Sequence, residues 1–252
     1  MKNLILKWLM QSVGQLSEGI RLGWRTGFDS GVILEYIYEN QPRGITPLGI
    51  WLDELFLKHP VWNGVRSRRT FLIQQIGNAI RHYEKPLLFD LAAGVGSYLF
   101  AQPPGKATII AGDYESEAVE RGKIKAEQSG RQDILFRHNN AFNLAEFASD
   151  RADILVASGF FDILTEDHQI QTVLKNGSTV TEAGARWVFT IQEHHPDLKM
   201  LQESLIDLHK RPWKLVPRPA EKLIEWAEPL GWQIERLERN QYFAVGTLLK
   251  IQ

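Results

Sequence analysis

The chain has 252 residues, 44% of them hydrophobic, which suits one α/β domain with a sizeable core and a terminal extension. Its 29 basic and 30 acidic residues leave a formal net charge of −1, which removes any global electrostatic case for nucleic-acid binding. Because the chain contains no cysteine, disulfides, thiolate metal ligands and cysteine nucleophiles are excluded.

The run MKNLILKWLMQSVGQL at residues 1–16 is apolar but too short to span a bilayer. Lys7 interrupts it and no small-residue cleavage site follows, so we expect an amphipathic helix and a cytoplasmic location. Weak contact with a membrane surface is the alternative, through the side chains of Leu4, Ile5, Trp8 and Leu9. Residues 1–64 are expected to form a helical N-terminal extension, and residues 65–252 the main domain.

From Pro86 onward, short apolar runs alternate with amphipathic stretches, a pattern typical of a mostly parallel sheet with helices on both faces. A helix is also expected at the glycine turn that follows the first strand, cut short by Pro103 and Pro104. The predicted strands are 87–91, 108–112, 134–138, 153–158, 187–191, 232–237 and 242–249, and the predicted helices are 65–81, 115–129, 166–183, 198–208 and 220–230.

The link between the last two predicted strands, Glu238–Gln241, is short. A parallel pair needs a crossover of about a dozen residues or more, so this link allows only a hairpin. The last strand is therefore expected to run antiparallel to the others.

The segment LLFDLAAGVGSY at residues 87–98 is an apolar strand that ends in Asp90 and opens into a glycine turn. Gly94 and Gly96 let the backbone approach a ligand in dihedrals that a Cβ would forbid. The next strand ends in Asp113, a position from which a carboxylate can accept hydrogen bonds from both ribose hydroxyls. Together these residues predict a site for a nucleoside cofactor.

The glycine spacing separates two cofactor classes. A dinucleotide fingerprint reads GxGxxG, and Leu99 occupies the third small position here. A GxG turn between two strand-end carboxylates instead favours S-adenosylmethionine, which has no phosphate to cradle. The alternative without a ligand is an ordinary turn, with Asp113 as a helix cap and Tyr114 as core filler.

Seven strands with a terminal antiparallel hairpin, this glycine turn and the ribose acid resemble the class I S-adenosylmethionine-dependent methyltransferases. The segments EGIRLGWRTGFDSG at 18–31 and WNGVRSRR at 62–69 resemble the methyltransferase domain often fused behind an α/β-hydrolase domain in bacterial bifunctional proteins. This resemblance covers the chain from about Ser17 onward. It implies a Rossmann-like sheet of order 3-2-1-4-5-7-6 with strand seven antiparallel, and S-adenosyl-L-methionine as the cofactor.

The resemblance also implies a set of cofactor-binding positions. Asn140 departs from the acidic residue that the family usually has there, although an Asn carbonyl can still accept a hydrogen bond from the adenine amino group. The expected cofactor-binding residues are Asp90, Ala92, Gly94, Gly96, Asp113, Tyr114, Asn140, Ala141, Phe142, Ser158 and Gly159.

After the fifth strand the chain reads QEHHP at 192–196, where the family tends to have Gln-Pro-Trp-His-Pro. Methyl transfer from a sulfonium needs mainly proximity and orientation, with a general base if the acceptor is a hydroxyl. We expect His195 to be this base, with Asp162 and Glu193 as further candidates and a purely structural histidine as the alternative. No metal is expected, because adjacent histidines on an extended segment point in opposite directions.

Arg66, Arg68 and Arg69 are expected to form a solvated basic edge, unless one of them binds a carboxylate or phosphate of the cofactor or acceptor. The sequence is compatible with three functions. The first is a methyltransferase for a small-molecule or lipid-like acceptor, and the second is a module that binds S-adenosylmethionine or S-adenosylhomocysteine without turnover. The third is a nicotinamide-dependent oxidoreductase, which Leu99 disfavours.

Overall fold

The computed structural model describes residues 2–144 and 151–252, and the chain divides into two compact units. One unit holds the residues up to Arg66 together with His195–Leu215, and the other holds Ser67–His194 and Val216–Gln252. The division falls inside helix α5 (Pro60–Ile80), and the boundary expected at residue 64 stays a prediction. Every helix in the described part of the chain is too short or too polar to cross a lipid bilayer.

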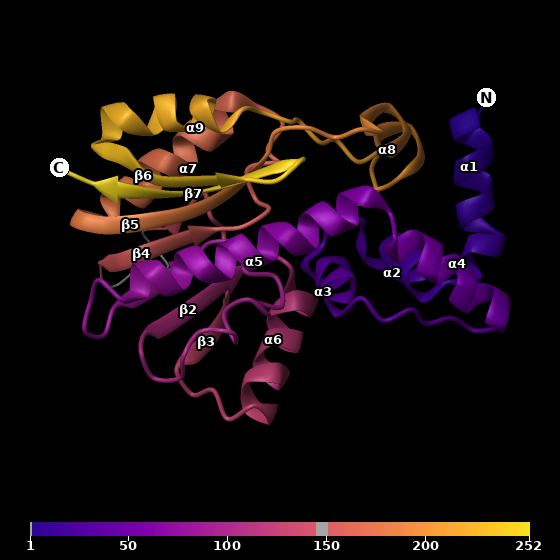
Figure 1. The fold of residues 1–252 in the computed structure, drawn as a ribbon, viewed down its shortest axis with the longest axis horizontal. Helices are drawn as coiled ribbons and strands as arrows, with labels where there is room; N and C mark the ends of the chain where they lie inside the picture. Colours follow the sequence, from indigo (N-terminus) through magenta and orange to yellow (C-terminus); the bar gives the residue numbers. More distant parts are fainter. Residues whose placement is uncertain (1, 145–150) are drawn as a thin grey trace. The chain divides into compact units, whose positions relative to one another are not determined.

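The second unit is built on a seven-stranded sheet in the order β3-β2-β1-β4-β5-β7-β6 (Figure 1). The first five strands run parallel, and β7 pairs antiparallel with both β5 and β6, so the predicted order and direction are confirmed. The strands are β1 (Leu87–Asp90), β2 (Thr108–Asp113), β3 (Ile134–His138), β4 (Ala152–Ala157), β5 (Thr181–Gln192), β6 (Trp232–Arg239) and β7 (Phe243–Lys250).

The predicted hairpin joins β6 to β7. In its tight turn the Asn240 side-chain carbonyl accepts hydrogen bonds from the backbone N–H groups of Tyr242 and Phe243, at 2.9 and 2.8 Å. A side chain that satisfies its own following backbone in this way favours a turn over a continued strand. The turn therefore reverses the chain and sets the direction of β7.

Helices cover both faces of the sheet, which is why its strands are nearly continuous apolar runs. On one face α7 (Asp167–Thr179) and α9 (Ala220–Ala227) pack in a core that includes Trp187 and Trp232. On the other face α6 (Ser116–Gln128) and the later part of α5 pack in a core that includes Leu72 and Phe136. Figure 1 shows these helices as two layers around the strands. The carboxyl ends of the parallel strands are followed by loops.

The helix expected after the glycine turn is absent. Instead, residues 97–102 form successive turns, in which Leu99 and Gln102 donate backbone hydrogen bonds to the carbonyls of Gly96 and Leu99, three residues earlier. Proline cannot donate in a helix, so Pro103 and Pro104 leave too few residues for a stable α-helical segment.

Three predicted helices also end earlier than expected. Helix α7 ends at Thr179 rather than at 183, because β5 begins at Thr181 and pairs there with β4. Helix α8 (Leu198–Ser204) ends before 208, in the first unit. Helix α9 gives way to the 3₁₀ turn η3 (Glu228–Leu230), which contains a proline.

The first unit is helical, as its sequence predicted. Side chains cap three of its helix starts: the hydroxyls of Ser17, Ser30 and Thr46 accept hydrogen bonds from backbone N–H groups three residues later. Besides α8 and the beginning of α5, this unit contains α1 (Lys2–Gln11), η1 (Val13–Leu16), α2 (Glu18–Thr26), α3 (Gly31–Glu39) and α4 (Pro47–Leu57).

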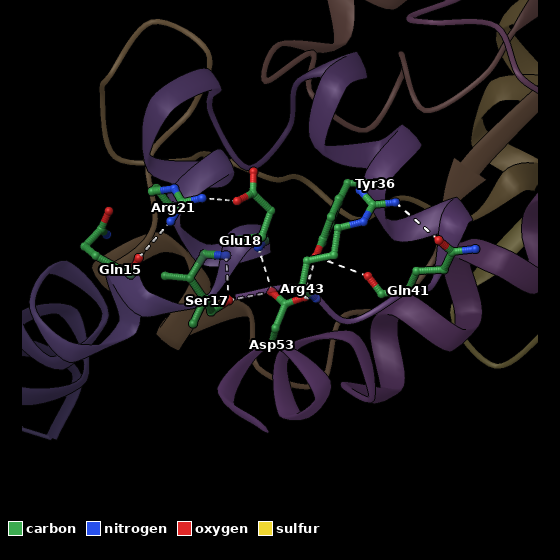
Figure 2. A network of polar contacts seen from close by, with 10 residues as sticks. Gln15, Ser17, Glu18, Arg21, Tyr36, Gln41, Arg43 and Asp53 are labelled. Carbon is green, nitrogen blue, oxygen red and sulfur yellow. Dashed lines mark hydrogen bonds and ion pairs between the residues drawn. The ribbon is translucent and has the colours of Figure 1, made fainter. Parts of the chain in front are cut away.

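A fully buried carboxylate, that of Asp53 on α4, joins these helices (Figure 2). One oxygen accepts hydrogen bonds from the Ser17 hydroxyl and, at 2.7 Å, from the Gly19 N–H. The other oxygen accepts from the Tyr36 hydroxyl and, at 2.9 Å, from the Arg43 N–H. Four donors make a buried carboxylate tolerable, because they replace the water that burial removes. Asp53 thus fixes α2, α3 and the loop at Arg43 against α4.

Candidate active site

The glycine turn follows β1 directly and has the backbone that its sequence requires. Gly94 and Gly96 have φ angles of 57° and 72°, in the left-handed region that favours glycine. A Cβ on Gly96 would also lie 2.9 Å from Cζ of Phe136, closer than side-chain carbons approach one another. The turn is therefore closely packed on its inner side, and a larger residue at Gly96 would displace it.

Asp113, at the end of β2, is bonded to this turn. Its Oδ2 accepts a 2.7 Å hydrogen bond from the Gly94 N–H, and its Oδ1 accepts a 2.8 Å bond from the Glu115 N–H. Burial raises the pKa of Asp113, and these backbone hydrogen bonds oppose the rise. Each carboxylate oxygen has two acceptor positions, so Asp113 retains capacity for further donors such as ribose hydroxyls.

Asp90, at the end of β1, is fully buried. It accepts a 2.6 Å hydrogen bond from the Tyr98 hydroxyl and a 3.3 Å bond from the Ala92 N–H. Burial and, to a smaller extent, the negative charge of Asp113 raise its pKa to about 7 against the effect of these hydrogen bonds. Two carboxylates thus stand at the ends of adjacent strands, and a nearby cation would favour the ionised form of both.

The turn also contains a polar atom that the protein does not satisfy. The hydroxyl oxygen of Ser97 is buried and has no hydrogen-bond partner among the described residues. Most buried polar groups in proteins have a partner, so a ligand at the glycine turn could supply the one that this hydroxyl lacks. Asp90, Asp113 and Ser97 together fit a cofactor that carries hydroxyl and ammonium donors.

The residues after β2 and β3 that were expected to contact adenine differ in their exposure and their contacts. Tyr114 is largely exposed, with its ring centroid 5.5 Å from that of His138, so it is not core filler. Asn140 is exposed, but its side-chain carbonyl already accepts a 3.0 Å hydrogen bond from the Phe142 N–H. Ala141 packs in the core and Phe142 is partly exposed beside Phe160.

The sequence did not single out Asn139, which is buried beside these residues. Its backbone N–H donates to the Asp113 carbonyl at 2.8 Å, and its side chain donates to the Leu91 carbonyl at 3.5 Å. Its Cβ leaves no room for a side chain on Gly112. Asn139 therefore holds the ends of β1, β2 and β3 together. The only sequence feature that pointed to Asn139 was its position next to Asn140, directly after the third predicted strand.

After β4, Ser158 is buried and Gly159 has a φ of 67°. The Gly159 N–H donates a 2.7 Å hydrogen bond to the hydroxyl of Thr190 on β5. A Cβ on Gly159 would lie 3.3 Å from Nη1 of Arg68. This glycine allows the turn to pass closely over the guanidinium group.

Arg68 corrects the expectation of a solvated basic edge, because it is 3% exposed. Its guanidinium lies 4.8 Å from the ring centroid of Phe243, and its Nη1 lies 3.8 Å from Oδ2 of Asp162. Asp162 is equally buried and accepts a hydrogen bond from the Gln192 N–H. Burial raises the pKa of Asp162 to about 6, and the charge of Arg68 opposes the rise. The structure therefore brings a buried charge pair to the carboxyl ends of β4 and β5.

The other two candidate bases are engaged elsewhere. Glu193 accepts a 2.9 Å hydrogen bond from the first N–H of α9, at Ala220, and pairs with Arg239 at 2.9 Å. In the first unit, Nδ1 of buried His195 accepts a 3.1 Å hydrogen bond from the Asp197 N–H. A neutral His195 bonded in this way carries its proton on Nε2, so Nδ1 is not available to remove a proton.

No cluster of three or more potential His, Cys, Asp or Glu metal ligands occurs within residues 2–144 and 151–252. The sequence model of a protein family described as "Putative methyltransferase" matches residues 1–245. The chain belongs to this family.

The chain is 32% identical over 255 residues to the uncharacterized protein YnbC of Escherichia coli strain K12. The match covers 96% of this chain and 43% of YnbC, so the chain spans less than half the length of that curated relative.

Two solved structures share the fold of this chain. A possible exported protein from Bordetella parapertussis has a TM-score of 0.70 at 17% identity, covering 88% of this chain and 80% of that one. The magnesium protoporphyrin IX methyltransferase ChlM from Synechocystis PCC 6803, solved with bound S-adenosylhomocysteine, has a TM-score of 0.62 at 12% identity, covering 89% of this chain and 97% of that one.

Proposed function

We propose that this chain is an S-adenosylmethionine-dependent methyltransferase for a small-molecule or lipid-like acceptor. The observation that carries the proposal is the pair of carboxylates, Asp90 and Asp113, on either side of a glycine turn that Asp113 itself bonds. The family supports methyl transfer, and the S-adenosylhomocysteine bound to the Synechocystis relative supports the cofactor.

Different residues of the chain would bind the ribose, the adenine and the methionine part of the cofactor. Asp113 would accept hydrogen bonds from the ribose hydroxyls, and Tyr114 would contact the adenine ring beside the segment 140–142. Asp90 and Ser97, with the backbone of the glycine turn, would face the methionine end. The ammonium and sulfonium charges of the cofactor favour an ionised Asp90, so binding would lower the pKa that burial raises.

S-adenosylmethionine supplies a methyl group on a sulfonium, whose departure leaves a neutral thioether. The protein therefore has no leaving-group charge to stabilise and contributes mainly by holding acceptor and methyl group in line. Gly159 and Ser158, after β4, would border the methyl group. The closely packed turns at Gly96 and Gly159 support this role, because both are fixed by contacts within the unit.

For a hydroxyl acceptor, Asp162 is the best supported of the three candidate bases. Its Oδ2 faces Arg68 at 3.8 Å, and burial brings its pKa to about 6, close to neutral. His195 would instead order the segment before α8, and Glu193 would cap α9. Arg68 would hold Asp162 in place and offer a positive charge to an acidic acceptor.

A second function, binding the cofactor without turnover, is favoured by one observation. Two of the three candidate bases, His195 and Glu193, are already committed to hydrogen bonds within the protein. Such a module would retain the Asp113 contacts and lack a base near the acceptor.

Transfer of label from methyl-tritiated S-adenosylmethionine separates the two functions. The purified protein is incubated with a bacterial extract, which is then divided into organic-soluble, small aqueous and macromolecular fractions. We expect label above background in the organic-soluble or small aqueous fraction, and loss of that label with Asp113→Asn. Binding of S-adenosylhomocysteine without label in any fraction would favour the binding module.

A further inference from the structure

Helix α1 exposes an unbroken apolar face. Leu4, Ile5, Trp8 and Leu9 are all exposed, Trp8 to 64%, while the opposite side of the helix is half-buried. At about 100° per residue these four side chains span an arc of about 140°. Figure 1 places α1 at the edge of its unit. A helix that presents large apolar side chains to solvent in one stripe indicates an interaction surface.

Helix α4, in the same unit, exposes a second apolar face. Leu48, Trp51 and Leu55 lie at i, i+3 and i+7, on one side of the helix, and Trp51 is 54% exposed. Ile45, just before α4, is also exposed. The opposite side of α4 carries the buried Asp53 and Leu57, so the hydrogen bonds of Asp53 and the burial of Leu57 turn that side of the helix toward the unit.

The two helices are joined through η1. The Leu16 carbonyl accepts a 3.0 Å hydrogen bond from the Ile45 N–H, and Gly49 of α4 leaves no room for a Cβ beside that carbonyl. Val13, the first residue of η1, is exposed as well. We call the apolar faces of α1 and α4, with Val13 and Ile45, the α1–α4 surface.

Among its own residues α1 is basic and α4 is balanced, and one acidic side chain of α8, Glu203, lies against α1, where it accepts a 2.6 Å hydrogen bond from Asn3. Residues 2–17 contain Lys2 and Lys7 and no acidic residue, although acidic residues make up 30 of the chain's 252. Helical geometry places Lys2 beside Leu9 at one border of the apolar arc of α1, where Lys2 is exposed, and Lys7 beyond Leu4 at the other border, where Lys7 is half-buried. On α4, Glu54 pairs with Lys58 at 2.6 Å, which leaves that end neutral.

We propose that the α1–α4 surface binds an anionic lipid surface. Apolar side chains and two tryptophans would enter the headgroup boundary, and Lys2 and Lys7 would meet acidic headgroups. A second copy of this chain is a poorer occupant, because a symmetric contact would bring the same lysines together. This inference does not depend on methyl transfer, which is tested separately through cofactor binding.

The test is flotation with vesicles of phosphatidylcholine alone and of phosphatidylcholine mixed with phosphatidylglycerol. We expect about thirtyfold stronger binding to the anionic vesicles, from two lysines near the surface. Ile5→Glu and Trp51→Glu should each weaken anionic binding at least tenfold. The double change Lys2→Gln with Lys7→Gln should remove most of the preference for anionic lipid.

Ile124→Glu is the matched control, because Ile124 is an exposed isoleucine on a helix of the other unit. It should bind vesicles as the unchanged protein does. Circular dichroism confirms that each variant is folded, and titration with S-adenosylhomocysteine reports the proposed function independently. The proposal is overturned if the unchanged protein floats with neither vesicle. Equal binding of anionic vesicles by Ile5→Glu and Ile124→Glu would also overturn it. So would an Ile5→Glu variant that loses self-association but keeps its vesicle binding.

Discussion

The backbone N–H of Gly94 donates a 2.7 Å hydrogen bond to Oδ2 of Asp113, joining the turn after β1 to the end of β2. The residue expected to bind the ribose therefore also shapes the glycine turn. Loss of this carboxylate would remove a ligand contact and loosen the turn together.

Gly96→Ala should lower both stability and cofactor affinity. Its φ of 72° strains any L-residue, and the new Cβ would lie 2.9 Å from Cζ of Phe136. We expect the free energy of unfolding to fall by roughly 2–4 kcal/mol, measured by urea denaturation. Gly105 is the control, because its φ is 70° and a Cβ there has open space. Gly105→Ala should cost only about 1 kcal/mol, and equal costs would contradict the packed turn.

Asp90→Asn should stabilise the protein without its cofactor. Burial raises the pKa of Asp90 from 3.8 to about 7, so between these pH values the folded state holds a proton that the unfolded chain has released. Stability contributed by this group therefore falls as pH rises from about 4 to about 7. The neutral amide should remove this fall and add roughly 2–4 kcal/mol at about pH 8. An unchanged pH dependence in urea denaturation would contradict the assignment.

Asp53→Asn should destabilise the first unit. The carboxylate accepts hydrogen bonds from four donors. An amide nitrogen in place of one oxygen is itself a donor and would face at least one of them, and the backbone N–H of Arg43 cannot turn away. We expect a cost of roughly 2–4 kcal/mol by urea denaturation. Glu54→Gln, on the next residue, removes only an exposed ion pair with Lys58 and should cost less than about 1 kcal/mol. Comparable costs for the two variants would show that the Asp53 network is not required.

If Asp162 is the general base, the rate of methyl transfer should rise with pH through about 6, as the carboxyl group loses its proton. Asp162→Asn should lower the rate about 10²-fold or more and abolish that rise. Asp133→Asn, before β3 at the opposite end of the strands, should retain the rise. A rise that persists in Asp162→Asn would assign the base to another group.

Much of the fold could be predicted because its determinants are local. Continuous apolar runs indicated buried parallel strands, and the short link after β6 required a hairpin. The prediction of a helix after the glycine turn was wrong. Pro103 and Pro104 leave so few residues after the turn that not even a short helix forms.

The remaining features depend on contacts between distant residues. The donors to Asp53 come from positions 17, 19, 36 and 43, and no spacing pattern links them. Arg68 lies in a basic triplet that is typical of a solvated edge, and only the packing of Phe243 and Asp162 around it shows its burial. Glu193 likewise finds its partners on α9 and β6. Side-chain partners of this kind follow from the tertiary fold.

The most direct test of the account is calorimetric titration of the protein with S-adenosylhomocysteine, compared with Asp113→Asn and Asp133→Asn. The account predicts binding in the micromolar range to the unchanged protein and to Asp133→Asn, and at least tenfold weaker binding to Asp113→Asn, which loses a carboxylate acceptor at the ribose position. Absence of binding to the unchanged protein, or equal affinity in Asp113→Asn, would contradict the assignment of the glycine turn as the cofactor site.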